Sequence, residues 1–319
     1  MSKIRLFDGM FEVSRAPKRG KRRKTSIWAA FALLGASTFG GVFVGDAASQ
    51  ETATSGSRAL AVVAKDAEKC GALLVGVDEY ETLTPLLYAS SDVRKLSAAL
   101  GEIGFPDETI RTFVSGGSIR ERPSRAKILA ALDEILAASG PESTVLIALS
   151  GHGFETENGD AAFCPEDVDA KTVDGKTFVK SETAILIEEV ATRLRKDDAK
   201  FKLLIVDACR EPATTERSAD AKARSFNPIP EPNGVAFLQS CESREFSWEH
   251  PELGGGVFSA FFAKGLRGAA DSDGDGGVSF LDVCGYVSRK TQERALAVFK
   301  SKQTPRVLFD GSDFWLTEP

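Results

Sequence analysis

The chain has 319 residues, of which 42% are hydrophobic and 27% are charged. These are the values of an ordinary globular protein, so they exclude a wholly disordered, collagen-like or multi-span membrane chain. Residues 1–25 hold nine Lys/Arg and two Asp/Glu, which leaves 31 basic and 44 acidic residues, a net charge of −13, for the remainder. Such an acidic body lacks the clustered Lys and Arg that bind phosphate, which excludes nucleic-acid binding.

Residues 1–49 have the pattern of a membrane-targeting segment. The basic run KRGKRRK at 18–24 precedes 21 uncharged residues, 25–45. This length can span a hydrocarbon core of ~30 Å as a helix, although glycine, serine and threonine dilute its hydrophobicity. A buried apolar helix of the fold is the alternative interpretation.

The residues after this run are typical of an export signal. Ala47, Ala48 and Ser49 resemble a cleavage site, and the arginine pair at 22–23 also allows a twin-arginine signal. We therefore predict a signal peptide or a membrane anchor, followed by a linker at 50–69. Because the basic run stays on the cytoplasmic side, the body is expected outside the cytoplasm, in the periplasm or cell envelope.

The body, residues 70–319, is predicted to be a single α/β domain. Apolar strand runs alternate with helical periodicity, which is the mark of a mostly parallel sheet with helices on both faces. Ser90 or Ser91 is expected to cap the first helix. Up to residue 210 the predicted strands are 71–77, 109–114, 143–153 and 201–210, and the predicted helices are 90–105, 123–140 and 181–197.

A polar, proline-bearing segment at 211–233 divides the domain and is predicted to be an exposed loop. The elements expected after it are a strand at 234–241, helices at 256–268 and 278–299, and a last strand at 305–309.

Two reactive side chains follow neighbouring apolar strands. His152 closes the run 143–153 and Cys209 the run 201–210, and both are expected just past the buried part of their strands, at the edge where open α/β sheets bind ligands. A thiol nucleophile needs such a base and donors for the oxyanion. The alternatives are a cysteine that packs the strand end and a structural histidine. Zinc is excluded by the irregular spacing of the five cysteines and the presence of only two histidines.

The sequences SGHG at 150–153 and DACR at 207–210, each closing an apolar strand, resemble the catalytic pair of the caspase-like cysteine proteases, most closely the bacterial metacaspase or orthocaspase branch. ALLVGVDEY at the first strand and GGGVFSAFFAKGLRG near the end belong to the same likeness, which extends from about Ala72 to Leu316. The chain departs from the true caspases at Asp207 and Glu211, where they have glutamine and glycine. Ala89 replaces a cysteine of the metacaspases.

The resemblance implies a caspase-like fold and a Cys/His dyad. Cys209 attacks the scissile carbonyl, His152 transfers the proton, and the N–H groups of Gly153 and Cys209 stabilise the oxyanion. It also implies a substrate-binding pocket for arginine or lysine formed by Asp92, Ser150 and Asp207.

Charge supports this pocket, because two partly desolvated carboxylates attract a cation and repel an acidic residue. The alternatives are a helix N-terminal carboxylate for Asp92 and a strand-end residue bonded to backbone for Asp207. The predicted loop holds Arg217, Lys222 and Arg224, which are candidate self-cleavage sites. An ordinary solvated loop is the alternative there.

The segment DSDGDGGVSFLD, residues 271–282, has the spacing of a twelve-residue EF-hand calcium loop. The candidate ligands are Asp271, Asp273, Asp275, the Gly277 carbonyl, Ser279 and Asp282. Aspartate in the last position, where glutamate is usual, favours a weak or structural calcium site. A metal-free turn is the alternative.

These observations predict an exported or membrane-anchored cysteine endopeptidase that cleaves after Arg or Lys and is stabilised by calcium, with basic peptides as its partners. The alternative is a catalytically silent caspase-like scaffold that binds partners through the 211–233 loop. A small-molecule hydrolase is disfavoured because no GxSxG motif occurs.

Overall fold

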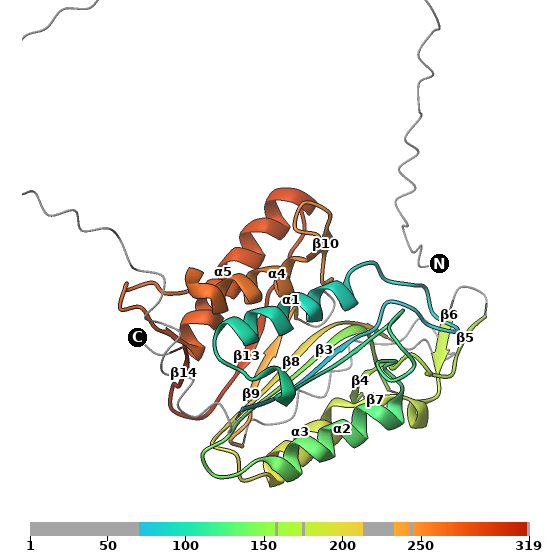
Figure 1. Ribbon diagram of the computed structural model, residues 1–319. Helices are drawn as coiled ribbons and strands as arrows, with labels where there is room; N and C mark the ends of the chain where they lie inside the picture. Colours follow the sequence, from blue (N-terminus) through green and yellow to red (C-terminus); the bar gives the residue numbers. More distant parts are fainter. Residues whose placement is uncertain (1–69, 157–158, 174–175, 213–232, 243–244, 318–319) are drawn as a thin grey trace, which may run out of the picture. The chain divides into compact units, whose positions relative to one another are not determined.

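The structure is a computed structural model and describes residues 70–317, apart from 157–158, 174–175, 213–232 and 243–244 (Figure 1). The predicted targeting segment, the linker and nearly all of the 211–233 loop therefore lie outside the described residues. Within the described part, no helix has the length and apolar character needed to cross a membrane.

The centre of the fold is a mixed sheet with the order β2-β1-β3-β8-β9-β13. The first five of these strands are parallel to their neighbours, and β13 is antiparallel to β9. This arrangement confirms the predicted mostly parallel sheet. The strands are β1 Cys70–Gly76, β2 Ile110–Val114, β3 Thr144–Glu155, β8 Phe201–Pro212, β9 Ala236–Gln239 and β13 Arg306–Leu308.

Short strands that the sequence analysis did not predict extend this sheet and form two-stranded sheets beside it. Strand β4 (Ala161–Phe163) pairs antiparallel with the end of β3 and with β7 (Ile185–Leu186). The remaining pairs are β5 Ala170–Val173 with β6 Lys176–Val179, β10 Glu249–His250 with β11 Gly255–Gly256, and β12 Val278–Ser279 with β14 Trp315–Thr317. Strands of two to four residues are too short to show a readable alternation.

Helices cover both faces of the sheet (Figure 1). On one face lie α1 (Ala89–Glu102), α4 (Val257–Lys264) and α5 (Phe280–Phe299), and on the other lie α2 (Arg125–Ala138) and α3 (Ile187–Lys196). A five-residue π-helix, Gly265–Ala269, continues α4, and short 3₁₀ turns occupy Asp107–Thr109 and Ser181–Thr183.

Each face of the sheet carries its own hydrophobic core, because successive strand residues point to opposite faces. Leu74 and Leu146 pack under α1, α4 and α5, whereas Leu73 and Ile147 pack under α2 and α3. Burial on both sides explains why the central strands are continuous apolar runs.

One predicted helix cap and one predicted helix start are wrong. Neither Ser90 nor Ser91 caps α1, which begins at Ala89 without a side-chain cap. The carboxylate of Asp78, from the loop before the helix, accepts the N–H of Ser90 at 3.0 Å instead. Helix α3 begins at Ile187 rather than at residue 181, because Ile185–Leu186 is used for pairing with β4.

The positions of His152 and Cys209 also differ from the prediction. Strands β3 and β8 are each twelve residues long and pair throughout, so both residues lie within strands rather than beyond their ends. The extra length of β3 is stabilised on its other side by β4, which pairs with Gly153–Glu155.

Candidate active site

The sheet places the two predicted dyad positions opposite each other. His152 on β3 and Cys209 on β8 are direct partners in the parallel register, although 209 − 152 = 57 positions separate them in the chain. Neighbouring strands lie about 4.8 Å apart. The backbone therefore brings the two positions side by side at the carboxyl end of the sheet, as the sequence analysis required.

The imidazole of His152 is oriented by a backbone carbonyl. Its Nε2 lies 2.7 Å from the oxygen of Thr84, in the loop that joins β1 to α1. A carbonyl oxygen can only accept, so Nε2 carries the proton, and in the neutral form of the ring Nδ1 is the nitrogen whose lone pair can accept one. This is the tautomer that a general base needs on the side away from Thr84.

The same loop also holds the backbone of His152. The hydroxyl of Tyr80 accepts the N–H of His152 at 2.7 Å, and the two rings lie 4.9 Å apart at 46°. The sequence analysis missed both Tyr80 and Thr84. A carbonyl contact leaves no trace in sequence, and the tyrosine was visible only as part of the ALLVGVDEY likeness.

Backbone alternation directs the N–H of Gly153 toward β8. The carbonyl of His152 accepts the N–H of Cys164 at 2.9 Å, so residue 152 uses its backbone groups on the β4 side of the strand. Along a strand these groups alternate in direction, and those of Gly153 consequently point to the opposite edge. The N–H of Gly153 therefore points into the β3–β8 ladder, toward the strand that carries Cys209.

Asp92, which is buried, and Asp207, which is partly buried, lie close together and line the same small cavity. The carboxylate of Asp92, on the first turn of α1, is 5% exposed and accepts the N–H of Gly256 at 2.8 Å. Asp207 on β8 accepts the hydroxyls of Ser247 at 2.7 Å and Ser259 at 2.5 Å. The Asp92 Oδ1 atom is buried and has no hydrogen-bond partner among the described residues.

The environment of Asp92 favours its protonated form. Burial is the main cause and the Asp207 carboxylate adds to it, so the pKa of Asp92 is raised to about 8 despite the Gly256 N–H and the ammonium of Lys95. Glu249 on β10 is a third acidic group whose charge raises this pKa. Burial likewise raises the pKa of Glu249 itself, and its other neighbours include Asp78 and Asp207. The sequence analysis missed Glu249, because nothing in its neighbourhood in the chain links it to α1.

The predicted third member of the pocket, Ser150, is buried on β3 directly opposite Asp207 in the register. Ser150, Asp92 and Asp207 line one cavity of about 20 Å³ between α1, α4 and the sheet. Such a cavity holds about one water molecule. A guanidinium group needs more room than this cavity offers.

Two other cysteines are unsuited to nucleophilic chemistry. Burial raises the pKa of Cys164 to about 12, and burial together with Asp313 raises the pKa of Cys284 to about 12. Both groups are therefore protonated thiols at neutral pH, and the thiolate is the nucleophilic form.

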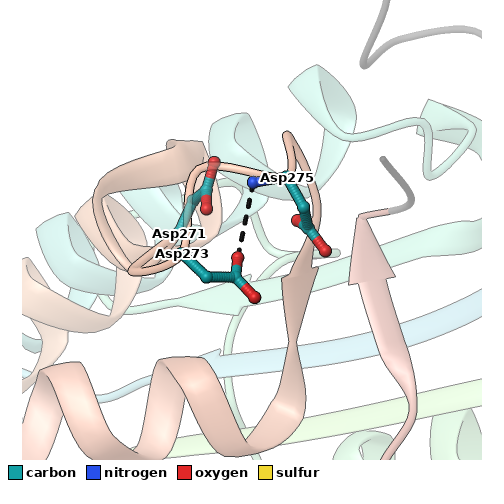
Figure 2. Close-up of side chains that lie close together, drawn as sticks. All are labelled: Asp271, Asp273 and Asp275. Carbon is teal, nitrogen blue, oxygen red and sulfur yellow. Dashed lines mark hydrogen bonds between the residues drawn. The ribbon is translucent and has the colours of Figure 1, made fainter.

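The acidic loop between α4 and α5 brings three of its predicted ligands together. The carboxylates of Asp271, Asp273 and Asp275 each offer an oxygen within 4.8 Å of the others (Figure 2). The Asp271 carboxylate accepts the N–H groups of Gly274 at 2.7 Å and Gly276 at 3.1 Å. Gly276 has φ +91°, the conformation that the sharp turn of such a loop requires.

The end of the loop starts α5. Ser279 is the N-cap, and Asp282 completes a capping box with it through bonds of 3.0 Å and 3.2 Å. Gly277 and Val278 lead into this cap through β12. The donors are hard carboxylate and carbonyl oxygens, which fit calcium.

Comparisons with known proteins agree with this fold. A family model for the caspase domain matches residues 69–310. The structure of caspase-1 from Spodoptera frugiperda is 15% identical, with a TM-score of 0.51, over 75% of this chain and 87% of that one. The structure titled pro-sf-caspase-1 is 13% identical, with a TM-score of 0.46, over 76% and 87%. At these identities the likeness to caspase-1 shows a shared fold alone. No curated protein gives a significant match.

Proposed function

The chain belongs to the caspase domain family, and from this premise we propose that it is a cysteine endopeptidase of the metacaspase-like branch that cleaves after arginine or lysine. The observation that carries the proposal is the direct pairing of His152 with Cys209 across β3 and β8. Substrates are protein or peptide chains with basic residues.

The proposed reaction follows from the roles of these groups. Nδ1 of His152 takes the thiol proton of Cys209, and the thiolate attacks the scissile carbonyl. The N–H groups of Gly153 and Cys209 stabilise the oxyanion. His152 then gives the proton to the leaving amine, and water hydrolyses the remaining thioester. The Thr84 carbonyl stabilises the imidazolium that forms in between.

The acidic pair supports the proposed specificity. Asp92 Oδ1 is buried without a hydrogen-bond donor among the described residues, although the Lys95 ammonium lies 3.9 Å away, and Glu249 adds negative charge from the β10 side. A cationic side chain supplies the missing partner, whereas an aspartyl side chain would add a further negative charge in a desolvated site. The alternative function is a catalytically silent scaffold.

The test compares arginyl, lysyl and aspartyl fluorogenic peptides on the full chain, with Cys209→Ala as the blank. We expect turnover of the basic peptides, with the aspartyl peptide at least about 100-fold slower, as expected for a desolvated like-charge contact of several kcal/mol. Comparable aspartyl turnover would contradict the basic specificity. No turnover of any peptide, with or without calcium, would favour the scaffold.

Self-cleavage between Glu211 and Asn233 is a further part of the proposal, because Arg217, Lys222 and Arg224 fit the same specificity. It would be read in the same experiment as a new N-terminus that appears in the wild type and not in Cys209→Ala.

We also propose that the 271–282 loop binds calcium and that the chain is exported or anchored through residues 25–45. Calcium would be held by Asp271, Asp273, Asp275, the Gly277 carbonyl, Ser279 and Asp282, and it would supply the positive charge that relieves the repulsion among them. A site of this kind stabilises the folded chain.

We expect calcium at about ten times its Kd to stabilise the protein by about 1.4 kcal/mol, measured by thermal unfolding. We choose Asp273→Asn rather than a change at Asp271 to remove one calcium ligand, because the Asp271 carboxylate also accepts two backbone N–H groups that hold the loop. The exposed Asp198→Asn is the matched control. Equal stabilisation of Asp273→Asn and wild type by calcium, or equal stabilisation by magnesium, would contradict the site.

A further inference from the structure

Tyr80 holds the backbone of His152 although the proposed reaction does not use it. Its hydroxyl oxygen accepts the His152 N–H at 2.7 Å, and its ring lies 4.9 Å from the imidazole. We propose that Tyr80 is a positioning residue that keeps the imidazole within reach of β8. This inference rests on the proposed protease function.

The bond from His152 to Tyr80 replaces one that the sheet would otherwise make. Cys164 donates its N–H to the His152 carbonyl at 2.9 Å. In an antiparallel ladder such a pair exchanges two bonds, so the His152 N–H would donate back to the Cys164 carbonyl. The Tyr80 hydroxyl receives this N–H instead. Only one backbone hydrogen bond, from the Cys164 N–H to the His152 carbonyl, therefore holds the strand at His152 toward the β4 side, instead of two.

Tyr80 is itself fixed in place. It packs between the core that includes Phe163 and the smaller cluster that includes Phe154 and Val168. Burial raises the pKa of Tyr80 well above its usual range, so the group is a neutral phenol at every working pH. A neutral hydroxyl accepts the N–H without placing a charge beside the imidazole.

Gly151 makes room for this arrangement. A Cβ at position 151 would lie 2.7 Å from the Tyr80 hydroxyl oxygen and 3.1 Å from the Phe163 ring. Any other residue there would push the phenol away from His152. The Tyr80 hydroxyl can thus reach the His152 N–H only if residue 151 is glycine, a role that the SGHG motif alone does not reveal.

Without the hydroxyl, the His152 N–H is free to pair with the Cys164 carbonyl. That movement carries the imidazole toward β4 and away from the strand that bears Cys209. Misplacement of a catalytic group by about 1 Å can lower a rate about 100-fold. The defect should fall on the chemical step, because Tyr80 lines no part of the acidic pocket.

The test is Tyr80→Phe, which removes one oxygen, with Tyr286→Phe on α5 as the matched control. We expect kcat on the arginyl peptide to fall at least about tenfold, at the lower end of what a general base contributes, with KM within about twofold. Tyr286→Phe should match wild type. Unchanged kcat in Tyr80→Phe would overturn the proposal.

A second measurement separates this inference from the protease proposal. The chain has two histidines, so the His152 imidazole can be followed by NMR, with His250→Gln for assignment. We expect its ¹⁵N shifts to change in Tyr80→Phe and not in Tyr286→Phe, whether or not any peptide is cleaved. Unchanged His152 signals would overturn the positioning role even in an active enzyme. Should Tyr80→Phe fail to fold, Gly151→Ala decides in its place, since it displaces the phenol without removing it.

Discussion

Asp92→Asn is expected to lose at least about 100-fold in kcat/KM on arginyl and lysyl peptides, because it removes a desolvated charge whose loss costs about 2–5 kcal/mol. The amide keeps the shape of the side chain and can still accept the Gly256 N–H, so the pocket is otherwise intact. Alkylation of Cys209 should proceed as in wild type, since the dyad is untouched. Asp198→Asn, which removes an exposed charge, is the control.

The pH dependence of wild type provides a sharper signature. With the pKa of Asp92 near 8, its carboxyl is mostly protonated in the empty pocket at pH 7, and a bound cation favours the ionised form. Because kcat/KM reports the free enzyme and kcat the bound complex, kcat/KM should rise through about pH 8 while kcat does not. The rise should be absent in Asp92→Asn. An identical pH profile in the two proteins would contradict the assignment of Asp92 to the pocket.

The same substitution should stabilise the fold at alkaline pH. The pKa of Asp92 is raised on folding, so its favourable contribution is complete below the unfolded pKa near 4 and is lost as the pH rises through about 8. Asparagine does not ionise, so the advantage of Asp92→Asn should be small at about pH 4 and reach on the order of 5 kcal/mol above pH 8. Urea unfolding at the two pH values measures it. A pocket residue that costs stability in this way is typical of a site kept for function.

The outline of the sheet could be predicted because its central strands are buried on both faces. Strands such as β1 and β8 are continuous apolar runs, bounded by helices with clear periodicity, and these features are local. The ends of the elements could not be predicted in the same way. The start of α1 depends on Asp78, and the start of α3 depends on pairing with β4, and both are contacts between segments distant in sequence.

The residues of the candidate site likewise fall into those that local sequence features indicate and those that act through contacts between distant segments. The chain offers His152, Cys209 and Asp207 toward the ends of apolar runs and Asp92 in the first turn of a helix, so a motif of reactive residue types indicates them. Tyr80 acts through its hydroxyl on a backbone N–H, Thr84 through its carbonyl, and Glu249 through a charge brought in by a hairpin of two-residue strands. These three roles arise only from contacts made on folding, because neither the side-chain type nor its spacing in the sequence predicts them.

The two glycines of β11, Gly255 and Gly256, lie directly against the Asp92 carboxylate. The Gly256 N–H donates to Asp92 Oδ2, and a Cβ at Gly255 would overlap Asp92 Oδ1. The Asp92 carboxylate is the far end of a side chain and can turn, whereas the β11 backbone is held by pairing with β10. Gly255→Ala should therefore rotate Asp92 away from Gly256 and out of its pocket position rather than move the hairpin.

We expect Gly255→Ala to lower kcat/KM on arginyl peptides at least about 30-fold, which corresponds to about 2 kcal/mol. Gly140→Ala, at a glycine with no heavy atom within 4 Å of the added Cβ, is the matched control and should be silent. Since the two changes act on the same carboxylate, their effects should not add: in an Asp92→Asn background, Gly255→Ala should cost less than about threefold. Full additivity would mean that Gly255 acts on the hairpin and not on Asp92. That outcome would move the origin of specificity from the carboxylate pair to the shape of the β10–β11 segment.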